Sequence, residues 1–125
     1  MSVRYRILPA VLAAVLLAGC GSATFNGSRT GNDSQLIMEY TVFNTTDGQT
    51  LELERGDRLL VEIVQEKGTL SLSIEGEGGE PLYADEDAQS GNFELEIPED
   101  GSYQVTVSGE QARGSLSVVR LERDA

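Results

Sequence analysis

Residues that could carry out chemistry are few in this chain. Its 125 residues include one cysteine, Cys20, no histidine, and 21 acidic against nine basic residues. Without histidine, the Ser-His and Cys-His pairs that activate a nucleophile are excluded, and so is a zinc site built from histidine and several cysteines. What remains is modification of one thiol, and acid–base or cation-binding chemistry at carboxylates.

The carboxylates allow two kinds of site. Glycoside hydrolysis uses a pair of carboxyl groups, and calcium takes six to eight oxygen ligands. Asp85, Glu86 and Asp87 are the weak candidates for calcium, and Glu77 and Glu80 lie similarly among glycines. The fixed spacing of an EF-hand loop is missing, and consecutive strand residues point to opposite faces. We therefore predict a solvated acidic surface with no metal, no cofactor and no catalytic residue; a calcium-stabilised structural module and a minimal hydrolase are the alternatives.

Cys20 follows a targeting segment. Arg4 and Arg6 precede an apolar run over residues 7–18, which is too short to span a bilayer and suits a signal peptide. The run leads into Leu17-Ala18-Gly19-Cys20, which resembles the lipobox of bacterial lipoproteins. The resemblance implies that residues 1–19 are removed and that the Cys20 thiol carries a lipid anchor, with palmitate-type acyl chains in the membrane. It also implies a location on the extracytoplasmic face of the cell membrane, or in the outer membrane of a Gram-negative host.

The net negative charge limits the classes of binding partner. The whole chain carries a net charge of −12. Loss of Arg4 and Arg6 with the signal peptide leaves 21 acidic and seven basic residues, a net of −14. Nucleic-acid binding depends on Lys and Arg neutralising phosphates, so nucleic acid is excluded as a partner. The acidity is expected to keep a monomeric surface domain soluble and away from anionic lipid headgroups; a site for a cation or a basic partner is the alternative.

The chain divides into three parts. Residues 1–19 form the signal peptide, and residues 20–34 form the lipidated Cys20 with a tether of small polar residues. Fourteen residues of such coil reach roughly 20 Å. Residues 35–125 form the folded domain. With no second cysteine, this domain is expected to fold without a disulfide, which its length permits.

From residue 35 onward the apolar period is two, which is typical of antiparallel strands with one solvated face. Turn signals separate the apolar runs at spacings of about ten residues, which indicates an all-β fold, an antiparallel β-sandwich of about seven or eight strands, jelly-roll-like. The apolar runs are centred on Leu36–Val42, Leu51–Leu53, Leu59–Ile63, Leu70–Ile74, Leu82–Tyr83, Phe93–Ile97, Tyr103–Val107 and Leu116–Val118.

Four short stretches carry more specific expectations. Asp47-Gly48 predicts a tight hairpin turn. Lys67-Gly68 and residues 112–114 predict further turns between strands. Residues 98–107 lead from a turn into a strand whose first apolar residue is Tyr103, as in the tyrosine corner of Greek-key sandwiches. We therefore expect the Tyr103 ring to be buried and its hydroxyl to bond to nearby backbone.

A wider resemblance extends over residues 58–119, about half of the chain. It depends on the order of strands and turns at residues 68–74, 81–83, 91–95 and 98–116. This pattern is similar to the small jelly-roll-like β-sandwiches of exported bacterial proteins, such as pre-peptidase C-terminal domains, and to uncharacterised small lipoproteins of Gram-positive bacteria. The resemblance implies a non-catalytic accessory module, and it transfers no functional residue.

Together these observations predict a membrane-anchored, non-enzymatic binding or accessory module of the cell envelope. The partner is expected to be an envelope protein or a glycan, bound through loops or one sheet face. Apolar residues at polar strand positions are the candidates for exposed contacts: Ile37, Phe43, Leu60 and Val64. A second sheet covering these positions is the equally weighted alternative.

Overall fold

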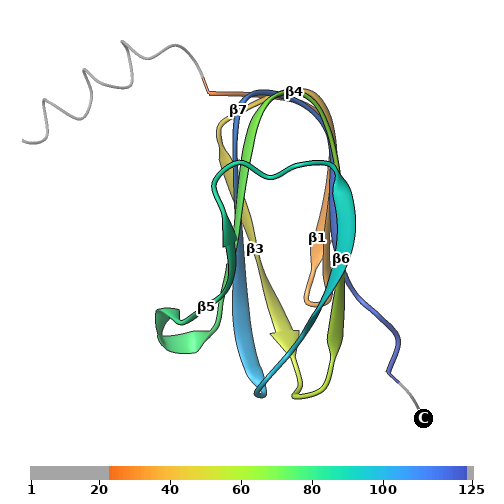
Figure 1. Cartoon of the computed structure of the whole chain (residues 1–125), viewed down its shortest axis with the longest axis vertical. Coiled ribbons are helices and arrows are strands. Elements are labelled where there is room, and N and C mark those ends of the chain that lie inside the picture. The colour runs from red at the N-terminus through yellow and green to blue at the C-terminus, as the bar shows by residue number, and fades with distance from the viewer. Residues whose placement is uncertain (1–22, 124–125) are drawn as a thin grey trace, which may run out of the picture.

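The computed structural model describes residues 23–123, and it is all-β apart from one 3-10 turn (Figure 1). Within these residues no helix is long and apolar enough to cross a membrane. The elements are β1 (Thr24–Asn32), β2 (Gln35–Asn44), β3 (Thr46–Leu53), β4 (Arg58–Glu75), η1 (Glu77–Gly79), β5 (Pro81–Asp85), β6 (Gly91–Glu96) and β7 (Gly101–Arg120).

Two long strands, β4 and β7, form the centre of the fold. They contain 18 and 20 residues and pair antiparallel from Leu59–Arg120 to Glu75–Gln104. Figure 1 shows both strands bending together at one end of the molecule. The pairing is irregular between Gln65 and Thr69. The turn predicted at Lys67-Gly68 is therefore wrong: the chain bends there while remaining paired, and the turn predicted at residues 112–114 is likewise part of β7.

The bend in β4 requires a glycine. Gly68 has φ of +74°, and a Cβ at this position would collide with the backbone carbonyl oxygens of Glu110 and Gln111 on β7. Gln111 itself has φ of +50°, in the left-handed region. The two strands thus turn the corner with their backbones in close approach, which only a residue without a side chain permits.

Because β4 and β7 bend, their two halves belong to different layers. The five-strand layer has the order β1-β2-β7-β4-β6 and uses the second half of β7 with the first half of β4. The four-strand layer has the order β3-β7-β4-β5 and uses the other halves. The predicted antiparallel β-sandwich is confirmed, with seven strands in one continuous sheet folded over on itself.

The core lies between the layers and follows the predicted alternation. The five-strand layer contributes Leu36, Met38, Leu59, Val61, Leu116 and Val118, and the four-strand layer contributes Leu51, Leu70, Leu72, Ile74, Val105 and Val107. Each of these side chains is at most 1% exposed. Full burial of an aliphatic side chain contributes about 1.5–3 kcal/mol each, so this double row is the main source of stability.

The start of the domain differs from the prediction. Residues 21–34 were expected to be a flexible tether, but residues 24–32 form strand β1, paired with β2 from Thr24–Asn44 to Asn32–Gln35. The expected boundary at residue 35 is therefore wrong within the described residues. β1 lies at a sheet edge, where its inward position Arg29 crosses to the other layer and bonds Asp47 Oδ2 at 2.9 Å and the Gly48 carbonyl at 2.6 Å.

Asp47-Gly48 is not a hairpin turn. Both residues lie inside β3, opposite Val107 and Thr106 of β7. The chain passes from the five-strand layer to the four-strand layer at Thr45, so β2 and β3 are not paired with each other. The carboxylate of Asp47 accepts hydrogen bonds from its neighbour's N–H and from Arg29, which explains an Asp-Gly pair in a strand.

Candidate functional site

The expected lipidation site, Cys20, lies outside the described residues, as does the signal peptide at residues 1–19. Strand β1 begins at Thr24, four residues after Cys20. Any anchor at Cys20 would therefore hold the domain by a much shorter connection than the predicted tether.

The weak calcium candidates occupy the connection from β5 to β6. Asp85 ends β5, and its carboxylate accepts hydrogen bonds from the Tyr83 hydroxyl at 3.3 Å and from the Asp87 N–H at 3.0 Å. Glu86 and Asp87 are exposed. Among residues 23–123 there is no group of three or more acidic, His or Cys side chains that could hold a metal ion. In this structure Asp85 shapes a loop. Burial of the Tyr83 side chain raises the pKa of its hydroxyl, and the nearby Asp85 carboxylate raises it further.

Of the four candidates for exposed apolar contacts, Ile37 and Val64 are exposed, at 37% and 46%, and Leu60 is half-buried. The expectation for Phe43 is wrong, because its side chain is completely buried in the core. The register of β2 against β7 is irregular between Tyr40 and Phe43, which shifts the alternation by one residue and turns Phe43 inward.

Backbone pairing brings the three remaining candidates onto one surface, the outer face of the five-strand layer. Ile37 lies opposite Ser117, Val64 lies opposite Ser115, and Leu60 lies opposite Val119. These side chains alternate with buried ones on each strand, so they share the outer face. We call this surface the outer patch; it consists of Ile37, Leu60, Val64, Ser115, Ser117 and Val119.

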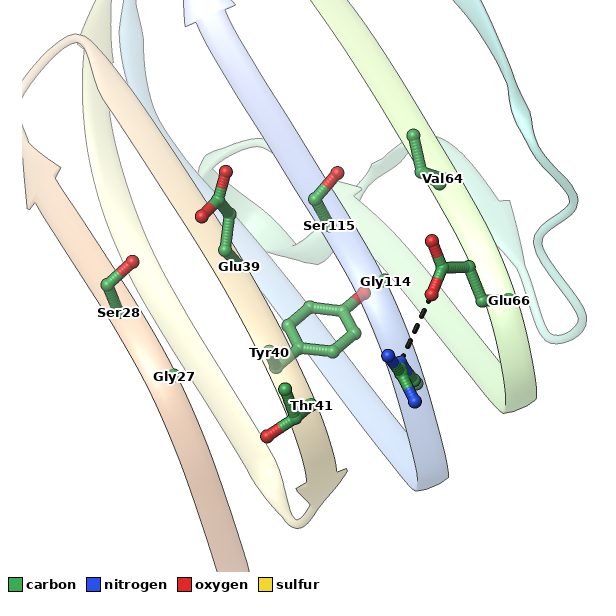
Figure 2. A pocket seen from close by; sticks show the side chains of 10 residues that line it. Gly27, Ser28, Glu39, Tyr40, Thr41, Val64, Glu66, Gly114 and Ser115 are labelled. Atoms are coloured by element: carbon green, nitrogen blue, oxygen red, sulfur yellow. Dashed lines mark ion pairs between the residues drawn. The ribbon is translucent and has the colours of Figure 1, made fainter.

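The outer patch continues into a hollow of about 460 Å³ (Figure 2). Ser28, Glu39 and Thr41 line it from β1 and β2, and Val64 and Glu66 line it from β4. Figure 2 shows these side chains on either side of Gly114 and Ser115, the β7 residues between them. Small residues on the central strand therefore make the depression, while longer side chains on its neighbours make the walls.

Gly114 is required at its position. Its φ is +147°, and a Cβ would collide with the Val64 carbonyl oxygen of β4. Gly114 also lies opposite Tyr40 of β2, and Gly27 of β1 lies opposite the same Tyr40 on its other side. Close backbone approach thus dictates glycines in the sheet interior, and the hollow follows from their missing side chains.

Carboxylates dominate the charge around this surface. Arg113 is already paired with Glu66, at 3.2 Å between Nε and Oε1 (Figure 2). Glu39 and Glu62 flank the outer patch on β2 and β4 and make no ion pair with any described residue. Below the hollow, burial raises the pKa of Tyr40 to about 12, so its hydroxyl stays neutral. The charges of this surface that have no ion-pair partner among the described residues are therefore negative.

The outer face of the four-strand layer has a different character. Its paired rows are mostly polar: Thr46–Ser108–Ser71, Gly48–Thr106–Ser73–Ala84 and Thr50–Gln104–Glu75. Several of these side chains bond to one another, as Thr46 does to Ser108 at 2.8 Å and Thr50 to Gln104 at 2.8 Å. The exposed large apolar residues of the described chain, Ile37 and Val64, both belong to the other face.

A second hollow, of about 230 Å³, lies between η1 and the β6–β7 turn and is lined by carboxylates. Glu77, Glu80, Glu99 and Asp100 surround it, and all four are exposed. Two of them hold backbone groups: Glu77 accepts from the Ser102 N–H at 3.3 Å, and Asp100 from the Arg55 N–H at 2.8 Å. The four carboxylates therefore form an open, solvent-exposed rim.

Tyr103 at the base of that hollow behaves as predicted. Its side chain is 5% exposed, and its hydroxyl donates to the Glu99 carbonyl oxygen at 2.6 Å. The tyrosine-corner interpretation is confirmed in this respect: the ring packs in the core, and the hydroxyl fixes the turn that precedes β7.

The same end of the sandwich contains the one buried charged residue of the described chain. Asp57 is 6% exposed and accepts two bonds from Arg123, at 2.8 and 2.9 Å, and one from the Glu54 N–H at 2.8 Å. The Arg123 guanidinium holds the pKa of Asp57 below its ordinary value. This pair attaches the end of the described chain to the turn between β3 and β4.

Comparisons with known proteins add a distant likeness in fold. The chain matches no protein-family model and no curated protein sequence. It is similar to a periplasmic inhibitor of g-type lysozyme, PliG of Aeromonas hydrophila, with 17% identity, 81% of this chain and 91% of that chain covered, and a TM-score of 0.49. It is also similar to a chain in the accessory secretory protein 1, 2 and 3 structure of Streptococcus pneumoniae, with 14% identity, 82% and 91% covered, and a TM-score of 0.39.

A third likeness is to a chain in the structure of Drosophila melanogaster CENP-C bound to CAL1, with 11% identity, 90% and 95% covered, and a TM-score of 0.40. At these identities and TM-scores the likenesses assign no function to this chain.

Sequence reasoning missed two parts of the site. The serines at 115 and 117 gave no signal, because small polar residues occur on any solvated strand face. The hollow was missed because Gly114 was interpreted as a turn residue. A glycine within a strand indicates a close backbone approach, and Gly114 shortly precedes the alternating run of Leu116 and Val118.

Proposed function

We propose that this chain is a membrane-anchored extracytoplasmic lipoprotein whose domain is a non-enzymatic binding module of the cell envelope, and that its outer patch binds a partner protein. The anchor is supported by Leu17-Ala18-Gly19-Cys20 behind its basic and apolar segments. One observation carries the binding role: the two outer faces of the sandwich differ, and the large hydrophobic side chains that are exposed among the described residues, Ile37 and Val64, both lie on the five-strand face.

The chemistry of the outer patch favours a protein over a glycan. Ile37, Leu60, Val64 and Val119 offer aliphatic contact, and Ser115 and Ser117 between them let a partner approach the backbone closely. Protein interfaces combine an apolar centre with a polar rim, and complementary charge selects the partner. The unpaired carboxylates beside the patch therefore call for a partner with basic side chains.

The non-enzymatic part of the proposal is supported by the placement of the carboxylates. Those around the second hollow are exposed, and two of them are engaged with backbone N–H groups. A hydrolase would need two carboxyl groups facing each other across an enclosed substrate site. An exposed apolar patch favours a binding module, whereas an enclosed pocket lined by carboxylates would favour an enzyme. The outer patch is of the first kind.

Photo-crosslinking in the producing cells tests the proposal. A photoreactive residue at position 37 or 64 samples the outer patch, and one at position 73 or 106 samples the opposite face as a matched control. We expect one shared crosslinked protein from positions 37 and 64 and none from 73 and 106, with the yield reduced by Glu62→Lys. Equal crosslinking from both faces, or none from the outer patch, would refute the binding role. Mass spectrometry of the native protein tests acylation of Cys20 separately, and a Cys20→Ala form that stayed on the membrane would refute the anchor.

A further inference from the structure

The folded-over sheet of the described chain has four edge strands, and they are protected to different degrees. β1 and β6 form the edges of the five-strand layer, and β3 and β5 form those of the four-strand layer. An edge strand presents unpaired backbone N–H and C=O groups. Proteins protect such an edge with proline, bulges or inward-pointing charged side chains, so the four edges can be compared for these features.

Three of the edges carry such protection. β1 and β3 lie on the same side of the sandwich, and Arg29 of β1 bridges them through its bonds to the Asp47 carboxylate. β5 contains only five residues and begins with Pro81. It also places Asp85 at an inward position, opposite the buried Leu72. A further strand could not pair with any of these edges without displacing a charged side chain or meeting a proline.

β6 has none of these features. Its six residues, Gly91–Glu96, pair with β4 without irregularity and include no proline. No other strand of the described chain pairs with it. Its inward side chains are the apolar Phe93 and Leu95, because these residues lie opposite the buried Val61 and Leu59. β6 is therefore the least protected edge of the sandwich.

The free edge of β6 presents the backbone of alternate residues. Directly after β6, the Ile97 N–H donates to the Asp57 carbonyl oxygen at 2.8 Å, in line with the register of β6 against β4. In an antiparallel pair, residues that exchange hydrogen bonds alternate with residues that do not. Counting back from Ile97, the N–H and C=O groups of Asn92, Glu94 and Glu96 therefore point away from β4.

Apolar side chains lie half-buried beneath this edge. Phe93 and Leu95 of β6, with Leu82 and Tyr83 of β5, pack against the core but are only partly buried. The ring centroids of Tyr83 and Phe93 are 4.9 Å apart, so the two rings meet between the layers. Figure 1 shows β6 at the margin of the molecule, between two crossings of the chain from one layer to the other. A strand added beside β6 would bury these side chains further.

We propose that β6, which we call the docking edge, accepts an extended segment of a partner protein as an additional strand. The segment pairs with the free backbone groups of β6, and its alternate side chains cover Phe93 and Leu95. Its other side chains lie beside Glu94 and Glu96 on the outer face, where Arg58 offers one distant ion pair, at 3.7 Å from Glu94. Because opposite charges on neighbouring strands stabilise the pair, the segment alternates apolar with basic residues.

Charge also argues against a second copy of this chain as the occupant. Two paired docking edges would bring Glu94 and Glu96 of both copies onto one face, and each copy carries a net charge of −12. The docking edge is distinct from the outer patch, although Leu60 of the patch lies opposite Glu94. The inference therefore needs neither the outer patch nor the anchor at Cys20, and it can fail without either of them.

A synthetic hexapeptide of alternating valine and lysine tests the docking edge on the isotope-labelled full chain. A peptide of three valines followed by three lysines keeps the composition and charge but loses the alternation. We expect the alternating peptide to bind several-fold more tightly. We also expect it to slow hydrogen exchange at the N–H groups of Asn92, Glu94 and Glu96. Equal affinity for the two peptides, or protection of a different edge strand, would overturn the inference.

Two variants separate backbone pairing from charge. Glu94→Pro removes an N–H that points away from β4, so we expect an unchanged Tm and about tenfold weaker binding or more. Glu96→Lys leaves the backbone intact and decides the question if the proline variant unfolds. It should weaken binding, whereas Glu75→Lys, the same change at an exposed residue of the four-strand face, should not.

Two results with these variants would overturn the inference. Equal weakening by Glu96→Lys and Glu75→Lys would mean that the peptide follows only the net negative charge. A dimer of the full chain, detected by light scattering and abolished by Glu94→Pro, would assign the docking edge to a second copy.

Discussion

Tyr40 and Tyr103 allow the same chemical change at two buried hydroxyls with opposite surroundings. Tyr103 donates to the Glu99 carbonyl at 2.6 Å, whereas the Tyr40 hydroxyl is buried without a hydrogen-bond partner among the described residues. Tyr103→Phe removes one neutral hydrogen bond, which contributes about 1 kcal/mol. Tyr40→Phe removes a buried hydroxyl that has lost its hydrogen bonds to water and makes none within the described residues. We therefore expect the free energy of unfolding to stay unchanged or to rise by up to about 1 kcal/mol.

Thermal and urea unfolding of the two variants give the test. For a domain of about 100 residues, 1 kcal/mol corresponds to roughly 4–8 °C in Tm. We expect Tyr103→Phe to lower Tm by several degrees and Tyr40→Phe to leave it equal or higher. Each ring stays in place, so the comparison isolates the hydroxyl. A loss at Tyr40 as large as that at Tyr103 would contradict the reasoning, because it would show that the Tyr40 hydroxyl has a stabilising partner.

The remaining predictions concern the Asp57–Arg123 pair, the sheet interior, the first strand and divalent ions. Because Arg123 lowers the pKa of Asp57, the pair stabilises the fold at pH values above the ordinary carboxyl pKa of about 3.9. This stabilisation is lost as the pH falls through the lower pKa of the folded state. In Asp57→Asn, the urea concentration at the unfolding midpoint should therefore vary less between pH 7 and pH 2. Gly114→Ala should destabilise by about 3 kcal/mol or more through its clash with β4, whereas Gly56→Ala, which meets nothing within 4 Å, should cost about 1–2 kcal/mol for its positive φ alone. A fragment beginning at residue 35 should unfold at lower urea than one beginning at residue 23 and should aggregate, because deleting β1 exposes the edge of β2. Calcium and magnesium at equal ionic strength should shift Tm equally; a selective rise with micromolar calcium would contradict the absence of a specific site.

Most of the fold could be predicted because one physical rule, alternation of apolar and polar residues, applies to every strand that faces the core. Leu70, Leu72 and Ile74 alternate with serines and are all at most 1% exposed. Tyr103 was interpreted correctly since a buried ring requires a partner for its hydroxyl, and the preceding turn supplied one.

Strand β1 could not be found in this way. Phe25 packs against the core near the start of the strand, but the other inward positions carry Gly27, Arg29 and Gly31, and Arg29 contacts β3. Composition alone makes such a strand look like a linker. Its pairing with β2 depends on a partner strand that no local pattern identifies.

The candidate site was predicted only in part for a related reason. Ile37 and Val64 break the polar pattern of their strand faces, so each is visible as a single exposed residue. Their common location depends on the register of β2, β7 and β4, which places serines between them. The inward turn of Phe43 depends on an irregularity in that same register. Register is a property of paired strands, so a single strand's sequence does not contain it.

The pairing of β1 with β2 determines how this domain would bear mechanical load. With a lipid anchor before Thr24 and a partner held on β2, β7 and β4, tension would pull β1 along its own axis relative to β2. Nine residue pairs, from Thr24–Asn44 to Asn32–Gln35, would then be loaded in shear and share the force, instead of opening one after another. The bonds of Arg29 to β3 would resist the same displacement. An edge strand of polar sequence would thereby serve as a tensile joint between an envelope partner and the membrane.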